Sequence, residues 1–103
     1  MLFLINWEIY ADKKNACNRV FSKMTPEDDA KDCGDKVKIR GRWHALGGGK
    51  GVCVCESDDE KAVSAWMQNW QDMCKIDVVP VIEDEDVRTI LKLKFEGEDK
   101  KEA

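Results

Sequence analysis

Residues 36–56, KVKIRGRWHALGGGKGVCVCE, decide the fold. Apolar and basic side chains alternate along 36–46 with the two-residue period of a strand. The glycine-rich run 47–51 then predicts a flexible turn, and 52–56 reads as a return strand. This stretch therefore predicts a β-hairpin.

The alternation also assigns the side chains of the first hairpin strand to two faces. One face would carry the apolar residues Val37, Ile39, Trp43 and Ala45. The other would carry the basic residues Lys36, Lys38, Arg40, Arg42 and His44. We therefore expect a basic strip along one side of the hairpin.

A strand and two helices are expected before the hairpin. Residues 1–8 are apolar on both faces, as in a central strand. Asp12 is a candidate cap for a helix that begins near Lys13 and continues to about residue 24. The run 25–33 combines a Thr cap, a proline in the first turn and an acid three residues after the cap, which predicts a short second helix ended by Gly34.

A helix, a strand and a terminal helix are expected after the hairpin. Ser57, followed three residues later by a glutamate, predicts a helix cap, and an apolar stripe at helical spacing continues to Met73. Residues 76–82 read as a fourth strand, which Pro80 would confine to an edge or a bulge. A short terminal helix is expected over 84–93.

The order β-α-β-β-α-β predicts a ferredoxin-like α+β domain over residues 1–93, with a four-stranded antiparallel sheet, followed by a charged, flexible tail over 94–103. Right-handed crossovers would place the helices on one face of the sheet. The other face would carry too many apolar groups to stay in water. We therefore expect a homodimer formed by pairing of these faces, which would also add burial to a small domain.

Composition argues against several classes of function. The net charge of −4 disfavours a nucleic-acid module. No apolar run approaches a membrane span and no leader is visible, so we expect a cytoplasmic protein without a membrane partner. Five cysteines, an odd number, suit free thiols. Cys53 and Cys55 share a strand face but lack further ligands at suitable spacing, so neither a metal nor a cofactor is expected.

The hairpin also carries a family resemblance. The run 41–45 (GRWHA), the glycine turn, Glu56, the pattern Trp66-x-x-x-Trp70-x-Asp72 and the run 79–81 (VPV) resemble a small bacterial and phage family of unknown function. That family is similar to the dimeric α/β-barrel superfamily, which includes antibiotic-biosynthesis monooxygenases, muconolactone-isomerase-like enzymes and stress-responsive barrel proteins. The resemblance covers about residues 1–92. It implies a dimeric barrel with an enclosed cavity between sheet and helices, and it implies no particular reaction.

Five residues are candidates for a ligand site. His44, the single histidine, titrates near neutrality and would serve as a proton shuttle or an anion partner. Arg42 would hold a carboxylate or phosphate. Trp7 and Trp43 would form an aromatic wall, and Glu56 would pair with the imidazole or the guanidinium. The competing interpretation is a solvated, charged edge strand.

Two functions stay open at this point. The first is a dimeric barrel that binds a small anionic or aromatic molecule in its cavity, with or without a cofactor-independent isomerase or oxygenase type of reaction. The second is a non-enzymatic interaction or regulatory module that docks on another protein, such as a host protein. A redox-sensitive thiol protein is a third, weaker hypothesis.

Overall fold

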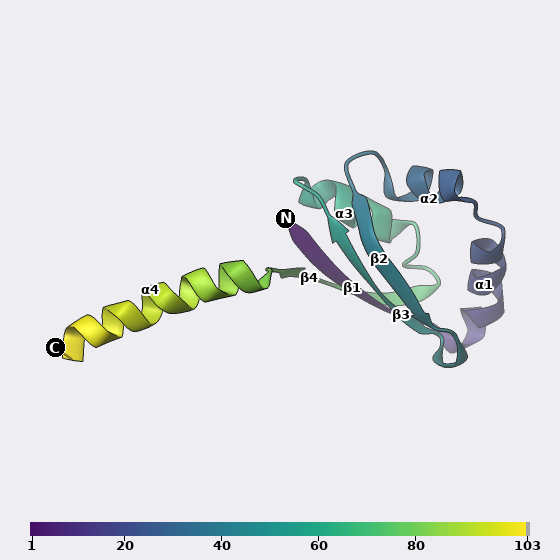
Figure 1. Cartoon of the computed structure of the whole chain (residues 1–103). Helices are drawn as coiled ribbons and strands as arrows, with labels where there is room; N and C mark the ends of the chain where they lie inside the picture. Colours follow the sequence, from purple (N-terminus) through teal and green to yellow (C-terminus); the bar gives the residue numbers. More distant parts are fainter. Residues whose placement is uncertain (103) are drawn as a thin grey trace.

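The computed structural model describes residues 1–102 as a four-stranded antiparallel sheet with four α-helices (Figure 1). The strand order β2-β3-β1-β4 is that of the ferredoxin-like fold, so the predicted fold class is confirmed. The strands are β1 (Leu2–Ile9), β2 (Lys38–Ala45), β3 (Lys50–Glu56) and β4 (Cys74–Val81). The helices are α1 (Lys14–Ser22), α2 (Pro26–Cys33), α3 (Glu60–Gln68) and α4 (Asp84–Glu102), with short 3-10 turns at Ala11–Lys13 and Leu46–Gly48.

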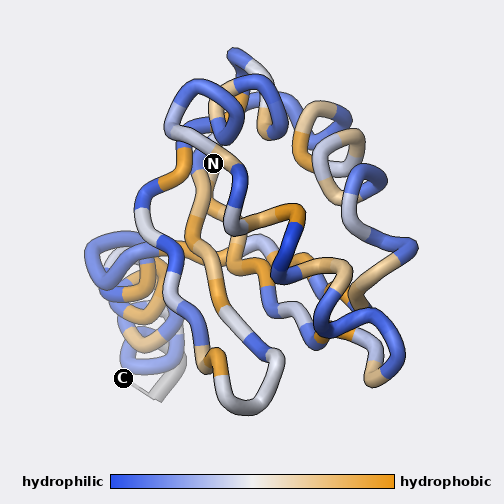
Figure 2. The backbone as a smooth tube through the Cα atoms, turned by 90° about the vertical axis from the view of Figure 1, so that its right-hand side faces the viewer, coloured by the Kyte–Doolittle hydropathy of each residue, from blue (hydrophilic) through white to orange (hydrophobic). Residues whose placement is uncertain are grey.

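Helices α1, α2 and α3 cover one face of the sheet (Figure 1). The main core joins the central strands to α2 and α3 through buried Phe3, Cys55, Cys33, Val63 and Trp66. A second, smaller cluster joins α1 to the sheet through Ile9, Cys17 and Cys74. Figure 2 shows hydrophobic residues through the middle of the molecule and also along the helix that leads to the C-terminus.

Only some of the helix caps predicted from the sequence are present in the structure. The predicted capping box at Thr25 is confirmed, and Gly34, at φ 84°, ends α2 as expected. The prediction of Asp12 as a side-chain cap is wrong, because a 3-10 turn precedes α1. The prediction of Ser57 as a cap is wrong too: Asp59 caps α3, and the buried Ser57 hydroxyl bonds the Asp59 backbone instead.

Strand β4 and helix α4 differ from expectation mainly in length. Pro80 lies in β4, an edge strand, as its missing N–H predicts. Helix α4 continues to Glu102, so the prediction that it ends at Leu93 is wrong. Within the described residues the segment expected as a flexible tail, 94–103, continues the helix, and Ala103 lies outside them.

A β-bulge in β2 overturns the predicted assignment of faces. Ile39 pairs with Cys55 while Gly41 pairs with Val54, so Arg40 is an extra residue. The bulge reverses the parity of the strand beyond it. Arg42 and His44 therefore lie on the helix-covered face together with Ile39, and the prediction of one continuous basic strip is wrong.

The opposite face of the sheet carries no helix (Figure 1). Partly buried or exposed apolar side chains run across it, namely Leu2, Leu4, Val52, Val54, Val79 and Val81. Helix α4 projects away from the sheet, and its side chains Val87, Ile90, Leu91 and Phe95 are exposed. Within the described residues no helix is long and apolar enough to cross a membrane.

Candidate functional site

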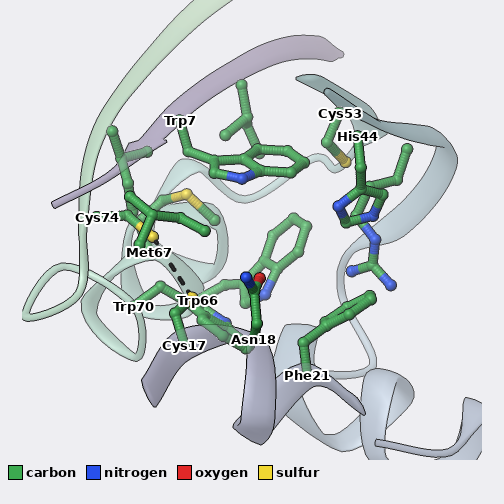
Figure 3. A pocket seen from close by; sticks show the side chains of 14 residues that line it. Trp7, Cys17, Asn18, Phe21, His44, Cys53, Trp66, Met67, Trp70 and Cys74 are labelled. Carbon is green, nitrogen blue, oxygen red and sulfur yellow. Dashed lines mark hydrogen bonds between the residues drawn. The ribbon is translucent and has the colours of Figure 1, made fainter. Parts of the chain in front are cut away.

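A cavity of about 90 Å³ lies between the helix-covered face of the sheet and helices α1 and α3. Figure 3 shows its walls: Trp7 from β1 and His44 from β2 on the sheet side, and Phe21 from α1 with Trp66 from α3 on the helix side. Most of the lining is aromatic, aliphatic or sulfur. The cavity therefore offers an apolar interior with few polar groups, the usual character of a small-molecule site.

Arg42 is the one cationic side chain among the described residues that line the cavity. Its Nη2 donates to Asp29 Oδ1 of α2 at 3.1 Å. The guanidinium also lies over the Phe21 ring, 4.9 Å from its centroid, in cation–π geometry. The side chains of Arg42 and Asp29 are only 19% and 29% exposed, so this ion pair is shielded more than a surface pair.

His44 lies beside Arg42 and contacts two aromatic rings. Its ring centroid lies 5.4 Å from that of Trp7, edge to face, and 5.0 Å from that of Phe21. Burial, and secondarily the charge of Arg42, lower the pKa of the imidazole below its usual value of 6.5. The ring is therefore neutral at pH 7, with one nitrogen that donates a hydrogen bond and one that accepts.

Asp32, near the end of α2, fixes the tryptophans of the cavity wall. Its Oδ2 accepts from Trp66 Nε1 at 2.9 Å and from Trp70 Nε1 at 2.7 Å, and its Oδ1 accepts from Asn69 Nδ2 at 3.0 Å. Sequence reasoning missed this carboxylate. The available signal was a set of three N–H donors at helical spacing at the end of α3 and just beyond it, which needs an acceptor from a neighbouring element.

The five cysteines are buried free thiols. Cys17 and Cys74 line the cavity with their Sγ atoms 3.9 Å apart (Figure 3). Burial raises the pKa of Cys53 to about 11 and of Cys74 to about 12, so these thiols stay protonated at neutral pH. Within residues 1–102 no group of three or more His, Cys, Asp or Glu side chains is arranged to hold a metal ion.

The structure brings together three of the five predicted site residues, namely Arg42, His44 and Trp7. Trp43 lies on the opposite face of the sheet, 60% exposed, because the bulge changed its side. Glu56 also lies on that face, where it accepts from Arg40 Nη1 at 2.7 Å. The expected pairing of Glu56 with the cavity residues is therefore wrong. Trp66, a member of the apolar stripe predicted for helix α3, is only 5% exposed and also forms part of the cavity wall.

Comparisons with known proteins give a family and similar folds. A family described as "Domain of unknown function (DUF3303)" matches residues 1–95. No curated protein matches the chain. Among solved structures, the chain is similar to L-rhamnose mutarotase FA22100 from Formosa agariphila, with 14% identity, a TM-score of 0.42, and coverage of 81% of this chain and 94% of that one. It is also similar to an uncharacterized NIPSNAP domain protein from Burkholderia xenovorans, with 14% identity, a TM-score of 0.44, and coverage of 82% and 97%. These similarities concern the fold alone.

Proposed function

The chain belongs to the DUF3303 family, a domain family of unknown function, and from this premise we propose that it binds a small aromatic or anionic molecule between its sheet and helices α1 and α3. One observation carries the proposal: the only two polar groups of β2 on the helix-covered face beyond the bulge, Arg42 and His44, line an otherwise apolar cavity. Polar groups that converge on an apolar pocket are the usual signature of a ligand site.

The volume of the cavity limits the ligand. About 90 Å³ is well below the roughly 300–1,000 Å³ of pockets that enclose drug-sized molecules. It is closer to an engineered cavity of about 150 Å³ that accepts benzene. The enclosed part therefore suits a single ring, with a polar substituent directed at the opening beside His44.

The wall supports an aromatic ring in particular. The faces of Trp7 and Phe21 would stack against it or meet its edge. The sulfur atoms of Met67, Cys17 and Cys74 also line the cavity, and sulfur packs favourably on ring edges. If the protein catalyses a reaction of the bound molecule, neutral His44 is the group placed to accept a proton from it.

Paired arginine variants test the proposal. Arg42→Ala should weaken binding of a single-ring probe such as benzamide or benzoate by tenfold or more, measured by quenching of tryptophan fluorescence and by calorimetry. Arg40→Ala is the matched control: it removes the same side chain from the same strand but from the opposite face, and should leave affinity unchanged. Equal affinity of both variants and the wild type would contradict the proposal.

Native mass spectrometry of the protein purified from cells gives an independent test. A co-purifying mass of less than about 200 Da that is lost in Arg42→Ala but kept in Arg40→Ala would support the site. Retention of the same mass by both variants would place the ligand elsewhere.

We also propose that the protein works as a homodimer, supported by the uncovered apolar face of the sheet. Exposed apolar patches of this kind mark interaction surfaces. Val79→Lys, on the edge strand β4 and pointing to that face, should shift the sedimentation coefficient from dimer to monomer without loss of helical circular dichroism. A wild-type chain that sediments as a monomer at 50 µM would contradict the dimer and favour the alternative, an interaction module for a different protein.

A further inference from the structure

The polar rim of the cavity carries no net charge. Arg42 is paired with Asp29 at 3.1 Å, and no other charged side chain lines the cavity among the described residues. Neighbouring His44 is uncharged at neutral pH. Asp29 does not itself line the cavity, but its carboxylate offsets part of the attraction that Arg42 alone would exert on an anion there.

The Asp29 bond leaves donors on Arg42 free for a ligand. A guanidinium has five N–H donors, and Asp29 takes one of them in the structure. The remaining donors, with the N–H of His44, would serve an oxygen that carries no charge. The indole N–H groups of Trp66 and Trp70 are not available to a ligand, because Asp32 already accepts both of them.

We infer that the cavity selects an uncharged single-ring aromatic molecule whose one hydrogen-bond-accepting oxygen lies at the rim, and that Asp29 is the residue that disfavours carboxylates. This inference rests on the proposed function and names its ligand class. An aromatic carboxylate would lose hydration in a largely apolar cavity, and the one cation that lines this cavity is already paired with Asp29. The neutral amide of the same shape loses less hydration on binding.

Benzamide and benzoate test the inference, because they share a shape and differ in charge. We expect the wild type to bind benzamide about tenfold more tightly than benzoate at pH 7. Asp29→Asn keeps an oxygen for Arg42 and removes the negative charge. It should therefore raise the affinity for benzoate about tenfold and leave the affinity for benzamide nearly unchanged. The matched control is Glu27→Gln, which removes an exposed carboxylate from the same turn of α2 and should behave as the wild type.

The outcomes separate the inference from the proposed function. If both probes bind the wild type and Asp29→Asn leaves their ratio unchanged, the inference is overturned while the ligand site stands. If neither probe binds the wild type, the inference and the aromatic site fail together. Asp29→Ser provides a second measurement should Asp29→Asn unfold: it also removes the negative charge, so it should raise the affinity for benzoate relative to that for benzamide, and an unchanged ratio would overturn the inference.

Discussion

Replacement of Asp32 by alanine should destabilise the domain by about 2–3 kcal/mol. The change removes the acceptor of two indole N–H groups, at 2.9 and 2.7 Å from Trp66 and Trp70, and one of these rings is buried. A hydrogen bond to a charged acceptor is worth about 1.5–3 kcal/mol, and a buried donor left without a partner costs a similar amount. Part of the loss is offset, because a negative charge near the end of α2 opposes the helix dipole by about 0.3–1 kcal/mol.

Two further variants divide that cost. Asp32→Asn keeps an oxygen for the indoles and loses the charge, so about 1 kcal/mol is expected. Trp70→Phe keeps the ring and removes one N–H. In that background Asp32→Ala should cost about 1 kcal/mol less than in the wild type, which gives the coupling energy of the pair.

Urea unfolding followed by circular dichroism measures these free energies. The indole N–H resonances of Trp66 and Trp70 provide a local check and should lose their protection from exchange in Asp32→Ala. The control is Asp35→Ala, an exposed acid just beyond α2, which should change stability by less than about 0.5 kcal/mol. An Asp32→Ala protein within 0.5 kcal/mol of the wild type would refute the view that this carboxylate fixes the wall of the cavity.

Three other expectations come from the same structure. A Cβ at Gly51 would collide with the Trp7 ring, which is packed at the cavity, so Gly51→Ala should lower the free energy of urea unfolding by about 1–3 kcal/mol. Gly41→Ala is the control: its Cβ would meet the exposed Trp43 ring, which can move, so the loss of stability should be smaller. Equal losses in the two variants would contradict this packing. The pKa of His44 in the folded protein lies below the unfolded value of 6.5, so between these two values the unfolded chain binds more protons than the folded one. The contribution of neutral His44 to folding stability is therefore present above pH 6.5 and is lost as the pH falls through the folded pKa. The single imidazole resonance should therefore titrate below pH 6.5, and a value above 6.5 would be inconsistent with a partly desolvated ring beside a cation. Burial raises the pKa of the Cys74 thiol to about 12, so the native protein should react with Ellman's reagent at pH 7.4 far more slowly than the urea-unfolded chain; five rapidly titrating thiols in the native state would contradict it.

Local sequence signals were sufficient for the fold. The hairpin, the capping box at Thr25 and the edge position of Pro80 each rest on chemistry confined to a few neighbouring residues, and the structure contains all three. The cap at Ser57 failed for a related reason: two residues of the same short run can cap, and Asp59 bonds the N–H of Lys61 while Ser57 is buried. Such a choice between adjacent caps depends on burial, which a local pattern does not contain.

The composition of the site was harder to predict. Assigning faces by alternation assumes an unbroken register, and one extra residue at Arg40 reverses every side chain after it. That reversal moved Trp43 out of the expected wall and moved Arg42 and His44 under the helices. Gly41 was a usable warning, since a glycine inside a strand often marks a bulge. Partners from distant elements, such as Asp32, were beyond any local pattern.

The bulge also determines the charge of the cavity. In a regular strand the arginines at 40 and 42 would share one face and form a cationic strip, which is the reason that the sequence suggested an anionic ligand. The extra residue separates them: Arg40 meets Glu56 on the open face, and Arg42 meets Asp29 under the helices. Each cation therefore acquires its own carboxylate, and the charge that a ligand encounters is set by the partner of Arg42 rather than by the number of arginines in the strand.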